Sequence, residues 1–172
     1  LLAPLSGLFV EEALAIDSVL YLDALKEGLK RKGVLFIDRK IESVQDFAAF
    51  DAAVAACGFE TPLLIADRDI PFRYLKGQGM EFDLPDGVEP FECAINGDLY
   101  AVMLKGNRRF FLGATFERGN SDPRADPIVA EEKIYPKIQE MMPALAKRRP
   151  VRIRSHVRLT TSSHFPVYER VD

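Results

Sequence analysis

The chain has 172 residues, of which 48% are hydrophobic, and its formal net charge is −3. This length and apolar content are enough for a buried core, so we expect a globular protein and not a disordered one. The basic residues are scattered, apart from the short run at 147–149, whereas nucleic-acid recognition needs a basic face. We therefore expect no nucleic acid as a partner.

Cysteine and histidine content restricts the chemistry further. Cys57 and Cys93 lie in apolar surroundings without a CxxC partner, which predicts reduced, buried thiols of a cytoplasmic protein. His156 and His164 lack the spacing of metal ligands, so no metal site is expected. There is no apolar run of the roughly 20 residues that span a bilayer, and we expect no membrane partner. Because the chain begins with two leucines, we interpret it as a segment of a longer protein.

The first third of the chain has the pattern of an αβ unit. Asp17 is expected to cap an amphipathic helix over residues 18–32 that ends before Gly33. The apolar run 34–37 has the length of a strand, and this succession is typical of parallel sheets. The expected packing face of the helix consists of Leu22, Leu25 and Leu29.

A second apolar run, at residues 52–57, consists of small side chains and predicts a strand that is covered on both faces. Gly58 follows it at an expected sharp turn. Thr61 and Pro62 then predict the start of a short helix, with a capping hydroxyl and a proline in its first turn.

The middle of the chain changes to strand-like alternation. Residues 71–82, 100–104 and 110–117 alternate, and turn signals separate them, so antiparallel pairing is expected. Asn96 and Gly97 form the strongest hairpin signal.

The only GxG pattern, at Gly77 and Gly79, lies inside the first alternating segment, and no helix follows it. It therefore cannot direct a helix N-terminus at a pyrophosphate and is not a dinucleotide fingerprint.

The polar loop 118–127 is long enough for a mobile lid and equally compatible with an inert surface. After it, a helix is expected from residue 127 to about 142, interrupted at Pro136. Its core-facing residues are predicted to be Ile134, Ile138 and Met142.

The last expected strand carries three arginines on one face, Arg152, Arg154 and Arg158, with Ile153 and Val157 on the other. All three arginines could simply be solvated. Arg158 stands where the strand enters a hydroxyl-rich turn, a position from which a guanidinium can bind a carboxylate with a fixed fork of donors. The carboxylates interpreted as surface or turn residues are Asp67, Asp69 and Glu81.

Several segments, in order, resemble the late part of the flavin-dependent D-amino-acid oxidase and glycine/sarcosine oxidase family. The first two are Ala55-Ala56-Cys57-Gly58 and Lys76-Gly77-Gln78. The next pair is Tyr100-Ala101-Val102-Met103 and Phe111-Leu112-Gly113-Ala114-Thr115-Phe116-Glu117. The last pair is Val157-Arg158-Leu159-Thr160-Thr161 and Phe165-Pro166-Val167-Tyr168. Three positions depart from the family pattern, with Leu159 in place of a proline, Ser163 of an aspartate and Glu169 of a glycine.

This resemblance implies an oxidoreductase that passes hydride from an amine or amino acid to FAD. It implies that Arg158, Tyr100 and Phe116 bind the substrate. The cofactor-binding residues that it implies are Ala56, Cys57 and Gly58. Tyr100 could instead be a sheet aromatic that packs across its hairpin, and Phe116 a core residue.

We therefore expect an α+β fold, a mostly antiparallel sheet with flanking helices beside a remnant of a parallel αβ lobe. Residues 1–172 are expected to form a single substrate-binding-type domain, in which the αβ part, 1–67, adjoins an upstream FAD-binding domain and 68–172 form the antiparallel sheet. The isolated chain is expected to fold without holding FAD. The alternative is a noncatalytic ligand-binding or interaction module that keeps the sheet without the cofactor.

Overall fold

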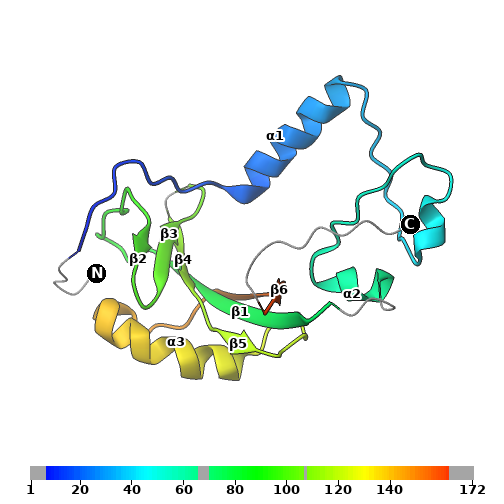
Figure 1. The fold of residues 1–172 in the computed structure, drawn as a ribbon. Coiled ribbons are helices and arrows are strands. Elements are labelled where there is room, and N and C mark those ends of the chain that lie inside the picture. Colours follow the sequence, from blue (N-terminus) through cyan, green and yellow to red (C-terminus); the bar gives the residue numbers. More distant parts are fainter. Residues whose placement is uncertain (1–6, 66–69, 107, 163–172) are drawn as a thin grey trace.

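The computed structural model describes residues 7–65, 70–106 and 108–162, which form an α+β fold with an antiparallel sheet (Figure 1). The strands are β1 (Phe72–Asp83), β2 (Ile95–Asn96), β3 (Tyr100–Met103), β4 (Arg109–Gly113), β5 (Glu117–Arg118) and β6 (Arg152–Thr161). The helices are α1 (Ser18–Arg31), α2 (Thr61–Leu64) and α3 (Pro127–Met141), with short 3-10 turns η1 (Val44–Phe47), η2 (Gly58–Glu60) and η3 (Pro143–Leu145).

β1 is the central strand of the sheet. The strand order is β2-β3-β4-β1, and β4 and β5 share one edge of β1 because they pair with different halves of it. β6 pairs along the other edge of β1 over ten residues. The antiparallel pairing predicted for the middle of the chain is confirmed, and the β2–β3 hairpin lies at the Asn96–Gly97 signal.

One face of the sheet packs against α3 and forms the hydrophobic core (Figure 1). The even-numbered β1 residues Met80 and Phe82 are buried there, together with the predicted helix residues Ile134, Ile138 and Met142. The other buried members of this core are Leu84, Leu99, Ala101, Phe110, Leu112, Ala130, Met141 and Leu145.

α3 begins at Pro127, as predicted, and it is capped by Asp126, whose side chain accepts the backbone N–H of Val129 at 3.1 Å. The interruption expected at Pro136 does not occur, and the helix continues to Met141. Pro136 lies on the exposed side. Burial of α3 residues on both sides of the proline compensates for the hydrogen bond that a proline removes.

α1 also follows its predicted bounds and cap, since Asp17 accepts the backbone N–H groups of Val19 and Leu20, both at 3.1 Å. Gly33 follows the helix with a φ of 84°, in the left-handed region that favours glycine. The predicted packing face is wrong in this structure, because no α1 residue is buried and Leu25 is 46% exposed. α1 stands apart from the sheet, on the side opposite α3 (Figure 1).

The two strands predicted at 34–37 and 52–57 are not formed. Both segments are exposed, with Leu35, Ile37 and Val54 among the most exposed apolar residues. A parallel strand is stable only when neighbouring strands and covering helices satisfy its backbone and bury both of its faces. The described residues supply neither, so the expected remnant of a parallel lobe is present only as α1 and unpaired chain.

Two further predictions concern the cysteines and membrane-spanning helices. The prediction of buried thiols is wrong, because Cys57 and Cys93 are both exposed and free. Among the helices that the structure describes, none combines the length and the apolar character of a membrane span. The segment that includes His164 and 165–168 lies outside the described residues, as do Asp67, Asp69, Ser163 and Glu169.

Candidate functional site

The face of the sheet that points away from α3, hereafter the open face, carries the last strand's arginines. Gln78 on β1 is buried towards α3, so the odd-numbered β1 residues point to the open face. Directly paired residues of antiparallel strands share a face, and Leu75 pairs with Arg158. The ion pair between Glu81 and Arg154 agrees with this assignment, since both side chains then lie on the open face.

Tyr100 and Phe116 lie on the same open face. Tyr100 pairs with Gly113 on β4, which pairs with Gly79 on β1. Phe116 stands two residues before Arg118, and the Arg118 guanidinium lies 5.4 Å from the centre of the Phe116 ring, so these two side chains share a face. All three predicted substrate-binding residues are thus on one surface, although they come from three different parts of the sheet.

These three side chains border the open face at separate places and do not touch. β3 and β6 are three strand spacings apart, so Tyr100 and Arg158 are separated by roughly 14 Å across the sheet. Phe116 lies on the chain between β4 and β5, on the β1 edge that faces away from β6. A small molecule on this face would therefore meet an aromatic border on one side and a cationic border on the other.

Glycines form the floor between these borders. A Cβ atom at Gly79 would lie 2.0 Å from Phe111 Cζ, and one at Gly113 would lie 3.0 Å from Tyr100 Cζ. The rings of Phe111 and Tyr100, whose centres are 5.7 Å apart, therefore lie down over these two glycines. At Gly77 the nearest atoms to such a Cβ would be the Thr115 carbonyl oxygen at 3.6 Å and Ala114 Cβ at 3.8 Å, so a methyl group would fit there in ordinary contact and no aromatic ring covers this glycine.

Tyr100 is half-buried by this packing, with 42% of its surface exposed. Burial raises the pKa of its phenol, so the hydroxyl is neutral at physiological pH and can donate a hydrogen bond. This geometry is compatible with both interpretations of Tyr100, as an aromatic residue that packs across the sheet and as a residue that contacts a ligand. The core alternative for Phe116 is wrong, because 60% of its surface is exposed.

Glu81 neutralises two arginines of the open face and is not the surface carboxylate that was predicted. Only 2% of its side chain is exposed, and Arg154 Nε donates to its Oε1. Arg109 lies 3.7 Å from its other oxygen and donates to Asp83 at 2.9 Å. Arg154 therefore already has a carboxylate partner.

Arg158 is exposed and, within the described part of the chain, has no carboxylate partner. Arg152 is likewise exposed and has no carboxylate partner among the described residues, but it stands opposite Glu81, four β1 positions from Gly77, whereas Arg158 stands two positions from Gly77. The strand parity that made the three arginines indistinguishable is confirmed, and the structure separates them by their partners and by their positions along β6.

A buried polar network on the α3 face positions the strand that carries Phe116. Glu117 accepts hydrogen bonds from Thr115 at 2.6 Å and from Gln78 at 2.9 Å, both at Oε1, and from Asn120 at 3.1 Å. Burial raises the pKa of Glu117, but these hydrogen bonds outweigh it and hold the pKa below the usual value. The open face and this network therefore use opposite sides of the same short strand.

The loop 118–127 is attached at both ends to this network. Asn120 donates to Glu117, and the backbone N–H of Asp126 donates to Gln78 Oε1 at 2.6 Å. Between these points Arg124 binds Asp122 with both Nε and Nη2, and the hydrogen bonds from Arg124 lower the pKa of Asp122 to about 2. These contacts hold the loop near the α3 face.

The predicted cofactor-binding residues Ala56, Cys57 and Gly58 form an exposed stretch that enters η2. Gly58 has a φ of 59°, and no atom lies within 4 Å of where its Cβ would be, so its backbone is open to a flat ring. The Thr61 hydroxyl donates to the Gly58 carbonyl at 2.8 Å and does not act as the acceptor of a helix cap. η2 lies against β6, which brings this stretch to the strand of Arg158.

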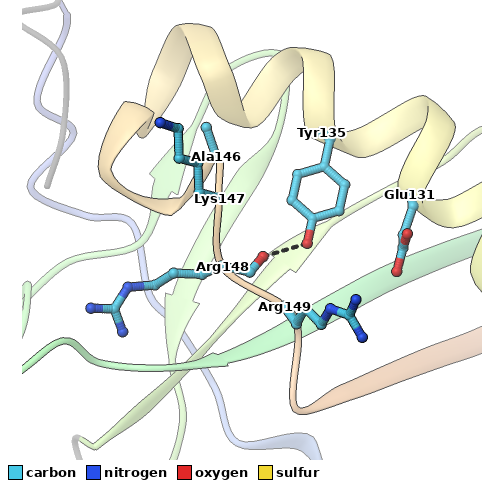
Figure 2. A pocket seen from close by; sticks show the side chains of 6 residues that line it. All are labelled: Glu131, Tyr135, Ala146, Lys147, Arg148 and Arg149. Atoms are coloured by element: carbon cyan, nitrogen blue, oxygen red, sulfur yellow. Dashed lines mark hydrogen bonds between the residues drawn. The ribbon is translucent and has the colours of Figure 1, made fainter.

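The structure also has a pocket between α3 and the segment 146–149 that leads to β6, with a volume of about 370 Å³ (Figure 2). It is lined by Glu131, Tyr135, Ala146, Lys147, Arg148 and Arg149. The Tyr135 hydroxyl donates to the Arg148 carbonyl, and the three cationic side chains point in different directions (Figure 2). None of the predicted site residues lines it.

Two cations of the open face, Arg73 and Arg118, were not among the residues predicted from the sequence. Arg118 shares a face with Phe116 because it is two residues further on, and Arg73 shares a face with Leu75 for the same reason. Strand alternation was the signal that could have found them.

In the part of the chain that is described, no group of at least three His, Cys, Asp or Glu side chains could hold a metal.

Comparison with known proteins identifies relatives of this fold. The model of the FAD dependent oxidoreductase family (DAO) matches residues 2–172. The glycine oxidase of Geobacillus kaustophilus has a similar structure, with a TM-score of 0.53 and 23% identity over 64% of this chain. The glycine oxidase of Bacillus cereus has a TM-score of 0.50 and 16% identity over 63% of this chain. A search of curated protein sequences finds no match.

The chain covers 30% of the length of each of these two glycine oxidases. At these identities the structural similarity establishes the shared fold alone, whereas the family model covers nearly the whole chain.

Proposed function

This chain belongs to the FAD dependent oxidoreductase family, and we propose that it forms the substrate-binding part of a protein that oxidises an amine or amino acid. Family membership implies FAD as the cofactor of the full-length protein, and bound FAD would supply the hydride acceptor for the substrate carbon. The residues described above would bind and orient the substrate, and no protein nucleophile is required.

The observation that carries the proposal is the unpaired guanidinium of Arg158. It extends from a strand that ten residue pairs hold against β1, so its backbone is fixed. Arg154 on the same strand is neutralised by Glu81, whereas Arg158 has no such partner among the described residues. A substrate carboxylate would provide the partner, through two parallel N–H donors.

The aromatic border and the glycine floor support the same role. Gly77 presents no side chain to the open face two positions from the Leu75–Arg158 pair, and the exposed ring of Phe116 would limit a bound ligand on the β5 side. The neutral Tyr100 hydroxyl would donate to a polar atom at the far border. Both aromatic residues are thus assigned to substrate binding and not to proton transfer.

We assign the N-terminal part, residues 1–67, to the contact with an FAD-binding domain of the same protein. Residues 7–65 contain no buried side chain, and α1 exposes Leu22, Leu25 and Leu29. An apolar surface of this kind is typical of a protein interface. Ala56, Cys57 and Gly58 would then approach the flavin ring, since all three are exposed, the Gly58 backbone is open and η2, which begins at Gly58, lies beside β6.

The test uses the full-length, FAD-loaded protein and Arg158→Lys. Lysine keeps the charge but loses the planar fork, so kcat/KM for a carboxylate-bearing amine should fall about 30- to 1,000-fold. Anaerobic flavin reduction by a panel of amines and amino acids measures it. Arg152→Lys is the matched control, because Arg152 is exposed on the same strand and unpaired, and its kinetics should stay near those of the wild type.

Two results would contradict the proposal. An Arg158→Lys enzyme with wild-type kcat/KM would remove this residue from the substrate site. A flavin that stays oxidised with every amine and amino acid of the panel would instead favour a noncatalytic binding module.

A further inference from the structure

We propose that the substrate carries a second carboxylate, which Arg118 binds with support from Arg73 while Arg158 binds the first. This inference rests on the proposed function and names its substrate class, a dicarboxylic amino acid. It follows from the arrangement of three cations around Leu75.

The three arginines surround one apolar residue. Leu75 pairs with Arg118 on one side and with Arg158 on the other, so their Cα atoms are two strand spacings apart, roughly 10 Å. Arg73 precedes Leu75 by two residues and is the diagonal neighbour of Arg158, at roughly 7–8 Å. All three therefore belong to the same end of the open face.

These cations have no carboxylate partners within the described residues, and all three are exposed. The buried carboxylate of the open face, Glu81, lies at the other end of β1 and already binds Arg154 and Arg109. Three like charges this close repel one another, so an anionic ligand would be attracted to them. A single carboxylate would neutralise only part of this charge.

The geometry favours two separate carboxylates on one ligand. Arg118 is held over the Phe116 ring at 5.4 Å, which orients its guanidinium before a ligand arrives. Between Arg118 and Arg158 lies Leu75, an uncharged residue of which only 9% is exposed, so the two cations are separated by a part of the face that holds no charge, as the two acidic groups of such a ligand are. A second anionic group near Arg118 would therefore be bound without displacing the first from Arg158.

The experiment measures equilibrium binding of two unreactive probes, glutarate and butyrate, to the full-length, FAD-loaded protein by titration calorimetry. Glutarate has two carboxylates and butyrate has one. Glutarate should bind about tenfold or more tightly than butyrate, because it forms an additional charge-assisted contact. Arg118→Gln should remove this difference and leave butyrate binding within about twofold of the wild type.

Controls separate a lost contact from a lost fold. Arg152→Gln should leave the affinity for both probes unchanged, because Arg152 is exposed on the same face at the other end of β6. Arg118→Lys, which keeps the charge without the fork, should retain part of the glutarate preference. The melting temperature of each variant should equal that of the wild type, since Arg118 and Arg152 are exposed.

The outcomes distinguish this inference from the proposed function. Equal affinity for glutarate and butyrate, with both weakened by Arg158→Lys, would overturn the dicarboxylate inference and leave the Arg158 site in place. If Arg158→Lys changes neither affinity, the carboxylate site at Arg158 is wrong, and this inference fails with it.

Discussion

Helices α1 and α3 have similar lengths, 14 and 15 residues, and each begins after an aspartate whose side chain accepts a backbone N–H. α3 buries Ala130, Ile134, Ile138 and Met141 against the sheet, whereas α1 buries no residue. Their local sequences therefore specify helices equally well. The difference between them is the presence of a second apolar surface, which β1 and β4 supply to α3 and which no described element supplies to α1.

The total surface shows how large this difference is. The chain exposes 13351 Å², whereas a compact protein of its size exposes roughly 8,500 Å². Residues 7–65 contribute no buried side chain to the core. The excess is roughly 4,900 Å², which is more than the roughly 1,000–2,500 Å² that one partner buries in an obligate interface, so the chain has ample surface for the proposed contact of its N-terminal part with an FAD-binding domain.

The largest effect is expected from truncating the buried side of α3. Ile138→Ala removes a fully buried side chain and should lower the free energy of unfolding of the chain by about 2–5 kcal/mol. Leu25→Ala in α1 should change it by less than about 0.5 kcal/mol, because Leu25 is exposed. Urea denaturation measures both.

Equal effects of these two substitutions would mean that α1 is packed in the isolated chain. The same two substitutions can be measured in the full-length protein. There Leu25→Ala should cost more than in the isolated chain if an FAD-binding domain covers α1.

A smaller effect is expected within the sheet. Gly79→Ala would place a Cβ 2.0 Å from the Phe111 ring, and the resulting overpacking should cost about 1–3 kcal/mol. Gly77→Ala is the matched control, because its nearest atom would be 3.6 Å away, and it should be neutral or stabilise the strand by up to about 1 kcal/mol. A melting temperature that falls more for Gly77→Ala than for Gly79→Ala would show that the Phe111 ring does not cover Gly79.

Removal of the two helix caps should have different effects, on the stability of the whole chain for α3 and on the helix alone for α1. Asp126→Ala should lower the free energy of unfolding by about 1 kcal/mol, since α3 is part of the core. Asp17→Ala should reduce the helical circular dichroism signal and leave the cooperative unfolding transition in place, since α1 is not packed. A shift of the main transition by Asp17→Ala would contradict the independence of α1.

The smallest effect concerns pH and the network beneath Phe116. The pKa of Glu117 is lower in the folded chain than its usual value of 4.5, so its ionised form is favoured by folding. Its contribution to stability is therefore full above pH 4.5 and is lost as the pH falls through the lower, folded pKa. Melting temperatures between pH 6 and about pH 3 should fall less steeply for Glu117→Gln than for the wild type. If the melting temperatures of the wild type and of Glu117→Gln fall equally steeply with pH, Glu117 does not contribute to the pH dependence of stability.

Much of the site could be predicted from the sequence because strand alternation is a local property. It placed Arg152, Arg154 and Arg158 on one face, and the structure confirms that shared face. The family resemblance is also confirmed, since the FAD dependent oxidoreductase model matches residues 2–172. The substrate-binding roles of Arg158, Tyr100 and Phe116 remain predictions.

The sequence by itself determined the local features, namely the cap at Asp17, the start of the later helix at Pro127, the antiparallel hairpins and the parity of each strand, because backbone geometry and near neighbours decide them. Only the tertiary structure decided that Arg154 is paired, whereas Arg152 and Arg158 have no carboxylate partner among the described residues. Glu81 and Arg154 are 73 residues apart, and their ion pair exists because β1 and β6 are adjacent. Tertiary contacts likewise decided that α3 is buried and α1 is not, because burial depends on a second surface that no local pattern contains.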